Sequence, residues 1–189
     1  SRSLKKRWTK KEKINIKEGK MQLELYRPFT KKWTNFLPPI IEYPGLWRRA
    51  FGNNYDESNI FLNIGSGDRY SVLISDLISD YQLIFNTKSI QLFEFDQDQL
   101  FGSYTTNVRD LWLKRIGTPL NVLDYSYSVL HSVDYKKKYL NDLKKTIPRI
   151  PLLVNPEEYI RIGEKLRLLH VNYEEQPNWD GVEVEISKP

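Results

Sequence analysis

The sequence predicts an α+β protein in which a small mixed-sheet lobe is followed by a helical lobe. Between residues 21 and 95, short apolar runs are separated by glycine, proline and asparagine, a pattern typical of strands joined by turns. After residue 119, apolar side chains recur at spacings of three and four, which favours amphipathic helices. We therefore divide the chain into a basic arm (1–20), a strand-rich lobe (21–95) and a helical lobe (96–189), which together form one module.

Composition narrows the possible classes of function. With 189 residues, 40% of them hydrophobic and 13% aromatic, the chain is long enough to bury a sizeable core. No apolar run approaches the length that spans a bilayer, so we expect no membrane partner. The lack of cysteine excludes disulfides and thiolate metal sites, and two histidines leave little for another metal. A cytoplasmic location fits these observations.

Positive charge is concentrated near the start of the chain. The first 32 residues hold 12 Lys or Arg against 3 acids, a net charge of +9, and the remaining residues hold 17 against 21, a net charge of −4. The basic arm is either a solvated tail, as like-charge runs usually are, or a segment that binds phosphates through counterion release. The chain opens on Ser1 rather than methionine, and we expect it to be a fragment of a longer protein.

Five segments of the strand-rich lobe are expected to form β-strands, at residues 21–26, 60–64, 70–74, 81–85 and 90–95. The proline-studded stretch at 35–44 argues against a regular helix there. The Gly-Ser-Gly run at 65–67 favours a tight connection between two strands. The alternative is a loop whose amides, together with Arg69, approach a DNA phosphate.

The helical lobe is expected to begin with a short helix at 105–112, followed by helices at 122–130 and 135–147. Pro148 ends the third of these. Asn155 before Pro156 predicts the N-cap of a last helix. Its expected apolar stripe consists of Ile162, Leu166 and Leu169. Beyond residue 176 we expect a short strand at 182–186 or a loose end.

Few residues offer catalytic chemistry. His131 and His170 lie in different predicted helices among apolar neighbours, which favours packed or capping histidines over a catalytic base. Asp76 and Asp80 are either paired carboxylates on a helix or parts of a turn. The sequence contains neither the metal-binding carboxylate pattern of a nuclease nor the Asn-Pro-Pro-Tyr motif of an adenine methyltransferase. We therefore expect no catalytic residue, no metal site and no cofactor in this chain.

Binding is the function that remains. Basic and aromatic side chains recur through the strand-rich lobe, and this combination suits a nucleic acid, because Arg reads guanine edges while Lys and backbone amides contact phosphates. The alternative is that the aromatic residues belong to the core and the lysines form a solvated face. The candidate DNA-binding residues are Arg27, Lys31, Lys32, Trp33, Arg48, Arg49, Arg69 and Tyr70. Lysines at 136–138 and 144–145 are further candidates for phosphate contacts.

Several short segments carry a family resemblance. They are YRPFTKKW at 26–33, SDLISDYQL at 75–83, the helical stretch at 130–152 that ends in IPRIPL, and the residues around Gly163 and His170 in the last helix. In this order, and over roughly residues 25–175, they resemble the C-terminal target-recognition region of type ISP restriction–modification enzymes. These are the single-polypeptide type I enzymes, and related type IIG enzymes share the pattern.

The resemblance implies sequence-specific recognition of double-stranded DNA. In such an enzyme this domain docks the duplex so that the methyltransferase domain of the same polypeptide can flip an adenine for N6-methylation, while a nuclease domain cleaves the DNA. The parent protein is then expected to use S-adenosylmethionine, ATP and Mg. Thr30 stands where the family motif often carries an acid, so no role for an acid is expected there.

Two other classes of function stay open. A protein–protein interaction module with no DNA specificity would also account for the aromatic content and the acidic second half of the chain. It predicts weak binding to oligonucleotides that does not depend on salt. An enzyme of unfamiliar type would need a carboxylate site around Asp76 and Asp80, and it predicts metal-dependent turnover.

Overall fold

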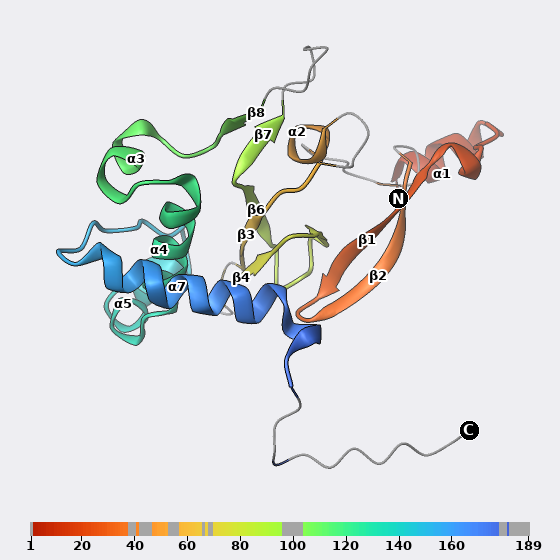
Figure 1. Ribbon diagram of the computed structural model, residues 1–189. Helices are drawn as coiled ribbons and strands as arrows, with labels where there is room; N and C mark the ends of the chain where they lie inside the picture. Colours follow the sequence, from red (N-terminus) through yellow and green to blue (C-terminus); the bar gives the residue numbers. More distant parts are fainter. Residues whose placement is uncertain are drawn as a thin grey trace.

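The computed structural model describes residues 2–37, 41, 47–52, 57–65, 67, 70–95, 104–177 and 181. Helices collect at one end of the molecule and a long hairpin lies at the other, with short strands between them (Figure 1). The elements are α1 (Arg2–Thr9), η1 (Ile16–Glu18), β1 (Lys20–Arg27), β2 (Thr30–Phe36), α2 (Trp47–Phe51), β3 (Phe61–Ile64), β4 (Val72–Ser75), β5 (Ile78–Ser79), β6 (Lys88–Gln91), β7 (Phe93–Phe95), β8 (Tyr104–Thr106), α3 (Asp110–Ile116), α4 (Pro119–His131), α5 (Val133–Lys138), α6 (Leu140–Leu143), α7 (Pro156–Val171) and η3 (Tyr173–Glu175).

The strands form three small sheets, with the orders β2-β1-β5, β4-β3-β6 and β7-β8. All their pairings are antiparallel except β1 with β5, which is parallel. The predicted α+β fold with a mixed sheet is therefore confirmed. Apolar side chains of β3 and β4 turn toward α4 and form the largest hydrophobic core with it, so the central sheet and the helices share one interior.

Helix α4 is deeply buried. The apolar spacing predicted burial of one side, but every residue from 122 to 130 is buried, and Tyr125 and Tyr127 are fully enclosed. Thr118 caps the helix by accepting a hydrogen bond from the Asn121 amide, and Pro119 occupies the first turn. Helix α7 packs along α4 so closely that a Cβ atom on Gly163 would lie 1.8 Å from the Asp124 carbonyl oxygen. Only glycine fits at this crossing.

Hairpin β1–β2 extends away from the helical end, and its turn meets the end of α7 and the following η3 (Figure 1). The turn residues are Pro28 and Phe29, and Phe29 has a φ of 58°, a left-handed conformation that costs a bulky residue about 1 kcal/mol. The Phe29 ring packs edge-on against His170 and Tyr173, at centroid distances of 5.6 and 5.2 Å. These contacts offset the strain and join the hairpin to α7.

Several predicted elements differ from the structure. Residues 81–85 form turns rather than a strand: the adjacent Leu83 and Ile84 both pack in the core, whereas Tyr81 and Phe85 are exposed, so burial does not alternate as in a strand. Residues 104–106 form β8, so the predicted helix begins later, at Asp110. The predicted helix at 135–147 is divided at Tyr139 and ends after Leu143. Strand β2 was not predicted. The predicted strand at 182–186 lies outside the described residues.

Helix α7 also differs in detail from the prediction. Asn155 occupies the N-cap position, but its side chain makes no capping hydrogen bond. Ile162 and Leu169 of the predicted apolar stripe are 40% and 47% exposed, whereas Gly163 and Arg167 are buried. Leu166, the third residue of that stripe, is partly buried and packs against the core, together with Tyr159 and Ile160. The side of α7 that enters the interior thus combines these apolar residues with the close approach at Gly163 and the Arg167 ion pair, and Ile162 and Leu169 remain outside.

Candidate nucleic-acid interface

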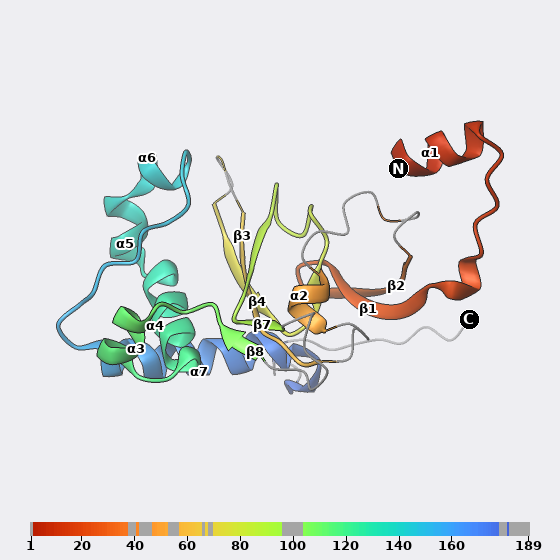
Figure 2. The same ribbon diagram turned by 90° about the horizontal axis from the view of Figure 1, so that it is seen from above.

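Two basic segments lie on the same side of the molecule. In Figure 2, α1 rises at the hairpin end and α5 with α6 at the helical end, while α3 and α7 lie on the opposite side. The side chains of Lys137 and Lys138 on α5, and of Lys145 in the turn after α6, are exposed. On α1 and the residues that follow it, the exposed lysines are Lys5, Lys6, Lys10, Lys11 and Lys13. A duplex carries a dense row of phosphates, so cations that flank one side suit its backbone.

The cations predicted on the hairpin are held by acids. Lys31 Nζ lies 2.6 Å from Glu174 Oε2 in η3, and this hydrogen bond raises the pKa of Lys31. Lys32 Nζ lies 3.0 Å from Glu24 Oε1 on the neighbouring strand, where Glu24 is buried and Lys32 is exposed. Both lysines are already paired with a carboxylate of the protein, so a DNA phosphate would have to compete with that carboxylate for the ammonium group.

Arg27 is similarly engaged. Its Nη1 atom donates to the Tyr26 carbonyl at 2.6 Å and to Asp80 Oδ1 at 3.3 Å. Its guanidinium also stacks on the Tyr26 ring, 4.0 Å from the ring centroid. The ion pair with Asp80 is partly exposed at both ends. Arg27 therefore joins β1 to the residue that follows β5.

The remaining predicted DNA-binding residues fall into three groups. Trp33 is 66% exposed on β2, and Arg49 is exposed on α2, so both side chains are accessible to a ligand. Tyr70 packs against the core shared by the central sheet and α4, and burial raises the pKa of its hydroxyl. Arg48 belongs to α2, but its side chain lies outside the described part of the chain, as does the whole of Arg69.

The two histidines meet in the interior rather than at the surface. The Tyr127 hydroxyl hydrogen-bonds with His170 Nδ1, and the His131 and His170 rings lie 6.0 Å apart. Burial lowers the pKa of both histidines, and that of His131 falls to about 4, helped by Lys136 and His170. Both side chains are therefore neutral at pH 7. They pack between α4, α7 and the hairpin turn.

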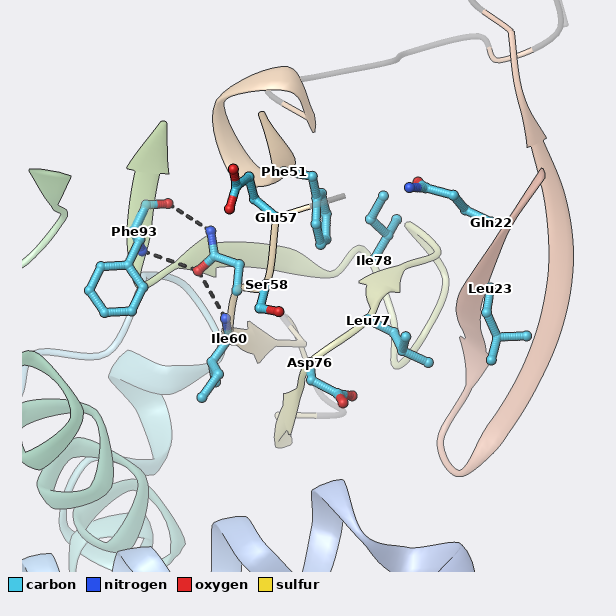
Figure 3. Close-up of a pocket in the computed structure, with 11 residues that line it drawn as sticks. Gln22, Leu23, Phe51, Glu57, Ser58, Ile60, Asp76, Leu77, Ile78 and Phe93 are labelled. Atoms are coloured by element: carbon cyan, nitrogen blue, oxygen red, sulfur yellow. Dashed lines mark hydrogen bonds between the residues drawn. The ribbon is translucent and has the colours of Figure 1, made fainter. Parts of the chain in front are cut away.

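A cavity of about 480 Å³ lies between β1, α2 and the central strands (Figure 3). Asn59 at its wall is buried, and its amide donates to the carbonyls of Ala50 and Phe93 while its oxygen accepts from the Ile60 and Phe93 amides. This side chain is saturated, so it serves to join α2 to β7. Asp76 lines the cavity, but Asp80 is paired with Arg27, and the predicted alternative of a carboxylate pair on a helix is wrong because both acids lie in turns.

Two further observations concern metals and membranes. Within the described ranges, no group of three or more His, Asp or Glu side chains is placed to hold a metal ion. None of the helices in that same part of the chain is long and apolar enough to cross a bilayer.

Sequence reasoning found the cations of the hairpin but not their partners. Glu174 lies 143 positions from Lys31, and Asp80 lies 53 positions from Arg27, so no local pattern links them. It also assigned residues 81–85 to a strand, although the flanking Asp80 and Asn86 are typical turn formers. These two residues could have indicated a loop at 81–85.

An α+β domain with basic segments on one side is the class of protein that suits a polyanionic ligand. Comparison with known protein families then shows to which family the chain belongs. The family model described as "Type ISP C-terminal specificity domain" matches residues 1–189, so the chain belongs to this family, and the resemblance in the sequence is confirmed. No curated protein is significantly similar to the chain in sequence.

Solved structures agree with this assignment. The ATP-dependent Type ISP restriction–modification enzyme LlaBIII bound to DNA matches all of this chain with a TM-score of 0.85 and 29% identity. A nuclease-deletion mutant of the Type ISP enzyme LlaGI, in complex with a DNA substrate mimic, also matches all of it, with a TM-score of 0.82 and 39% identity. The DrdV–DNA complex matches 92% of the chain with a TM-score of 0.81 and 22% identity, which shows a shared fold. The chain spans only 13%, 14% and 18% of these three chains.

Proposed function

We propose that this domain recognises a specific sequence in double-stranded DNA and that the duplex lies on the side that carries α1, α5 and α6. The observation that supports the proposal most directly is that the two basic segments lie on one side of the domain (Figure 2). The chain also belongs to a family described as a specificity domain. The solved relatives LlaBIII and LlaGI are bound to DNA or a DNA substrate mimic, which supports DNA as the ligand.

In this proposal, affinity and specificity have different sources. The exposed lysines of α1 and α5–α6 would contact phosphates, and such contacts release counterions and weaken as salt is added. Sequence would be read by other side chains that reach base edges in a groove. The basic arm is then a phosphate-binding segment rather than a solvated tail.

The proposal extends to the longer enzyme to which such a domain would belong. We propose that its parent is an N6-adenine DNA methyltransferase and endonuclease that acts in the cytoplasm. S-adenosylmethionine, ATP and Mg²⁺ would serve its catalytic domains. The domain described here would hold the duplex while an adenine is flipped from the stack. It would contribute no catalytic residue of its own.

The test is selection of the 189-residue chain on randomised duplex DNA at two salt concentrations. We expect enrichment of one short sequence that contains adenine, and an affinity that falls steeply as salt rises. Replacing Lys137, Lys138 and Lys145 by alanine should reduce the slope of log affinity against log salt by about one for each phosphate that is no longer neutralised. The enriched sequence should stay the same.

A matched variant controls for net charge. Lys114, Arg115 and Lys165 are exposed residues of α3 and α7, the two helices that lie on the opposite side in Figure 2, and their triple alanine variant carries the same change in charge. It should retain the salt slope of the unchanged chain. Equal effects of the two triple variants would contradict the proposed side of binding, and a lack of DNA binding at low salt would overturn the function itself.

A second partner is the methyltransferase domain of the same polypeptide. Ile162, Leu168 and Leu169 are exposed apolar side chains of α7, the helix that lies on the side away from the basic segments, where another domain can cover them. In the full-length enzyme, a Leu168→Glu, Leu169→Glu variant should expose the junction to limited proteolysis. An unchanged digestion pattern would count against this contact.

A further inference from the structure

The segment from Asp80 to Thr87, here called the 80–87 loop, connects β5 to β6 and has no role in the binding described so far. Its exposed side chains include Tyr81, which is 64% exposed, and Phe85, which is 42% exposed. Gln82 is also exposed, and neither it nor Asn86 has a side-chain hydrogen bond among the described residues. The loop thus offers amides and aromatic rings rather than charge.

The backbone of this loop is fixed by its own hydrogen bonds. Asp80 Oδ1 accepts from the Gln82 amide at 2.7 Å, and the Leu83 amide donates to the Asp80 carbonyl at 2.9 Å. The Thr87 amide donates to the Tyr81 carbonyl at 2.8 Å, which closes the loop. Leu83 is 1% exposed and anchors the centre of the loop in the core. A loop held this way loses little conformational entropy when it binds a ligand.

The strands on either side are fixed as well. Ser79 at the end of β5 and Ser89 in β6 both donate to the Asn63 side-chain oxygen, at 2.6 and 2.7 Å. Asn63 is fully buried in β3, and its amide donates to the Ser75 hydroxyl at 2.9 Å. The base of the 80–87 loop therefore rests on one hydrogen-bonded polar cluster in the central sheet.

The position of the loop matters as much as its rigidity. In Figure 2 it rises on the same side as α1, α5 and α6, and it lies between the two basic segments. A Cβ atom on Gly67 would lie 3.9 Å from Phe85 Cε1, so the loop also borders the connection between β3 and β4. A duplex held by phosphate contacts at both ends would pass over this loop.

We propose that the 80–87 loop enters a groove of the bound duplex and that Gln82 reads the edge of an adenine, with Asn86 and the aromatic rings beside it. A Gln or Asn amide matches the N6 and N7 atoms of adenine with two hydrogen bonds, and a Phe ring suits the methyl group of thymine. The inference rests on the proposed DNA recognition and names the part of the domain that provides the specificity.

Arg27 has a defined part in this arrangement. Asp80 Oδ1 accepts both from Arg27 Nη1 and from the Gln82 amide, so the hairpin and the loop share one carboxylate. The Asp80 amide also donates to the Leu25 carbonyl at 3.0 Å. Arg27, which the sequence suggested as a DNA contact, is thus a positioning residue for the residue that reads the base.

The experiment repeats the selection on randomised duplex DNA with the unchanged chain, with Gln82→Ala and with Gln82→Arg. For Gln82→Ala we expect the preference at one adenine position to fall by about tenfold while the other positions keep theirs. For Gln82→Arg we expect the preferred base at that same position to change to guanine, because Arg pairs with the O6 and N7 atoms of guanine. Thermal unfolding of each variant verifies the fold.

Gln176→Ala is the matched control, since Gln176 is an exposed amide in the segment after η3. It should leave the enriched sequence unchanged. If the unchanged chain enriches a sequence and both Gln82 variants enrich the same one with the same base frequencies, the inference is overturned while DNA recognition stands. A uniform loss at all positions would likewise overturn base reading by Gln82. A failure of the unchanged chain to bind DNA overturns the proposed function.

Discussion

The helical end and the hairpin end of this domain are held together by opposite means. At the helical end, Arg167 forms a bidentate pair with Asp124, at 2.7 and 3.1 Å, and the two side chains are only 11% and 3% exposed. At the hairpin end, Lys31 and Glu174 are 24% and 59% exposed. Burial makes a lost partner costly, whereas solvent and salt screen an exposed pair.

This difference separates changes that test the fold from changes that test function. The helices contribute nine of the fourteen buried residues of the largest hydrophobic core, so substitutions there should alter the free energy of unfolding. The exposed side chains of the hairpin and of the 80–87 loop, together with the exposed lysines, lie at the surface, so their substitutions should alter ligand binding and leave the fold largely intact. The following predictions test this separation, in order of expected effect.

The largest effect is expected for Asp124→Asn. It leaves the buried Arg167 guanidinium without a compensating charge, and the free energy of unfolding should fall by about 3 kcal/mol or more in urea denaturation. Adding Arg167→Met should recover part of this loss, because no charge then remains buried. A loss below about 1 kcal/mol for Asp124→Asn alone would mean that the pair is worth no more than the exposed pairs.

Gly163→Ala should destabilise the domain by about 2–3 kcal/mol, because the new methyl group collides with the Asp124 carbonyl oxygen and forces α4 and α7 apart. Lys165→Ala, on the exposed side of the same helix, is the control and should change stability by less than about 0.5 kcal/mol. Equal unfolding midpoints for the two variants would disprove the close approach of the helices.

Acid should destabilise the helical end through His131. Its folded pKa of about 4 lies below the unfolded value of 6.5, so the unfolded state binds the proton more readily. This contribution to stability is complete above pH 6.5 and is lost as the pH falls toward 4, by about 2 kcal/mol between pH 7 and 5. Unfolding of His131→Asn should show a shallower dependence in this window, and a parallel curve would rule out this origin.

The smallest effect is expected for Lys31→Ala. Removing this exposed pair should lower the free energy of unfolding by less than about 1 kcal/mol, and the loss should shrink in high salt. Phe29 still packs on α7 in this variant, so the hairpin should stay docked. A loss as large as that of Asp124→Asn would remove the distinction between the two ends.

The helical end was easier to predict from the sequence than the site. The spacing of Val122, Tyr125 and Val129 indicates a buried helix because local periodicity reports directly on burial. The ion pairs of Arg27 and Lys31 join residues that are far apart along the chain, and periodicity has no information about them. The buried side of α7 was predicted only in part for the same reason, since Leu166 packs against the core, whereas the glycine contact and the Asp124–Arg167 pair leave Ile162 and Leu169 exposed.

The parallel pairing of β1 with β5 has a consequence for how this domain folds. Hairpin β1–β2 closes locally and can form within about 10 µs, but its pairing with β5 joins residues more than 50 positions apart. Contacts of such long separation form late, since the chain entropy of the intervening segment is lost first. We expect the hairpin to dock onto a nearly complete helical end, as the last slow phase in a stopped-flow refolding experiment.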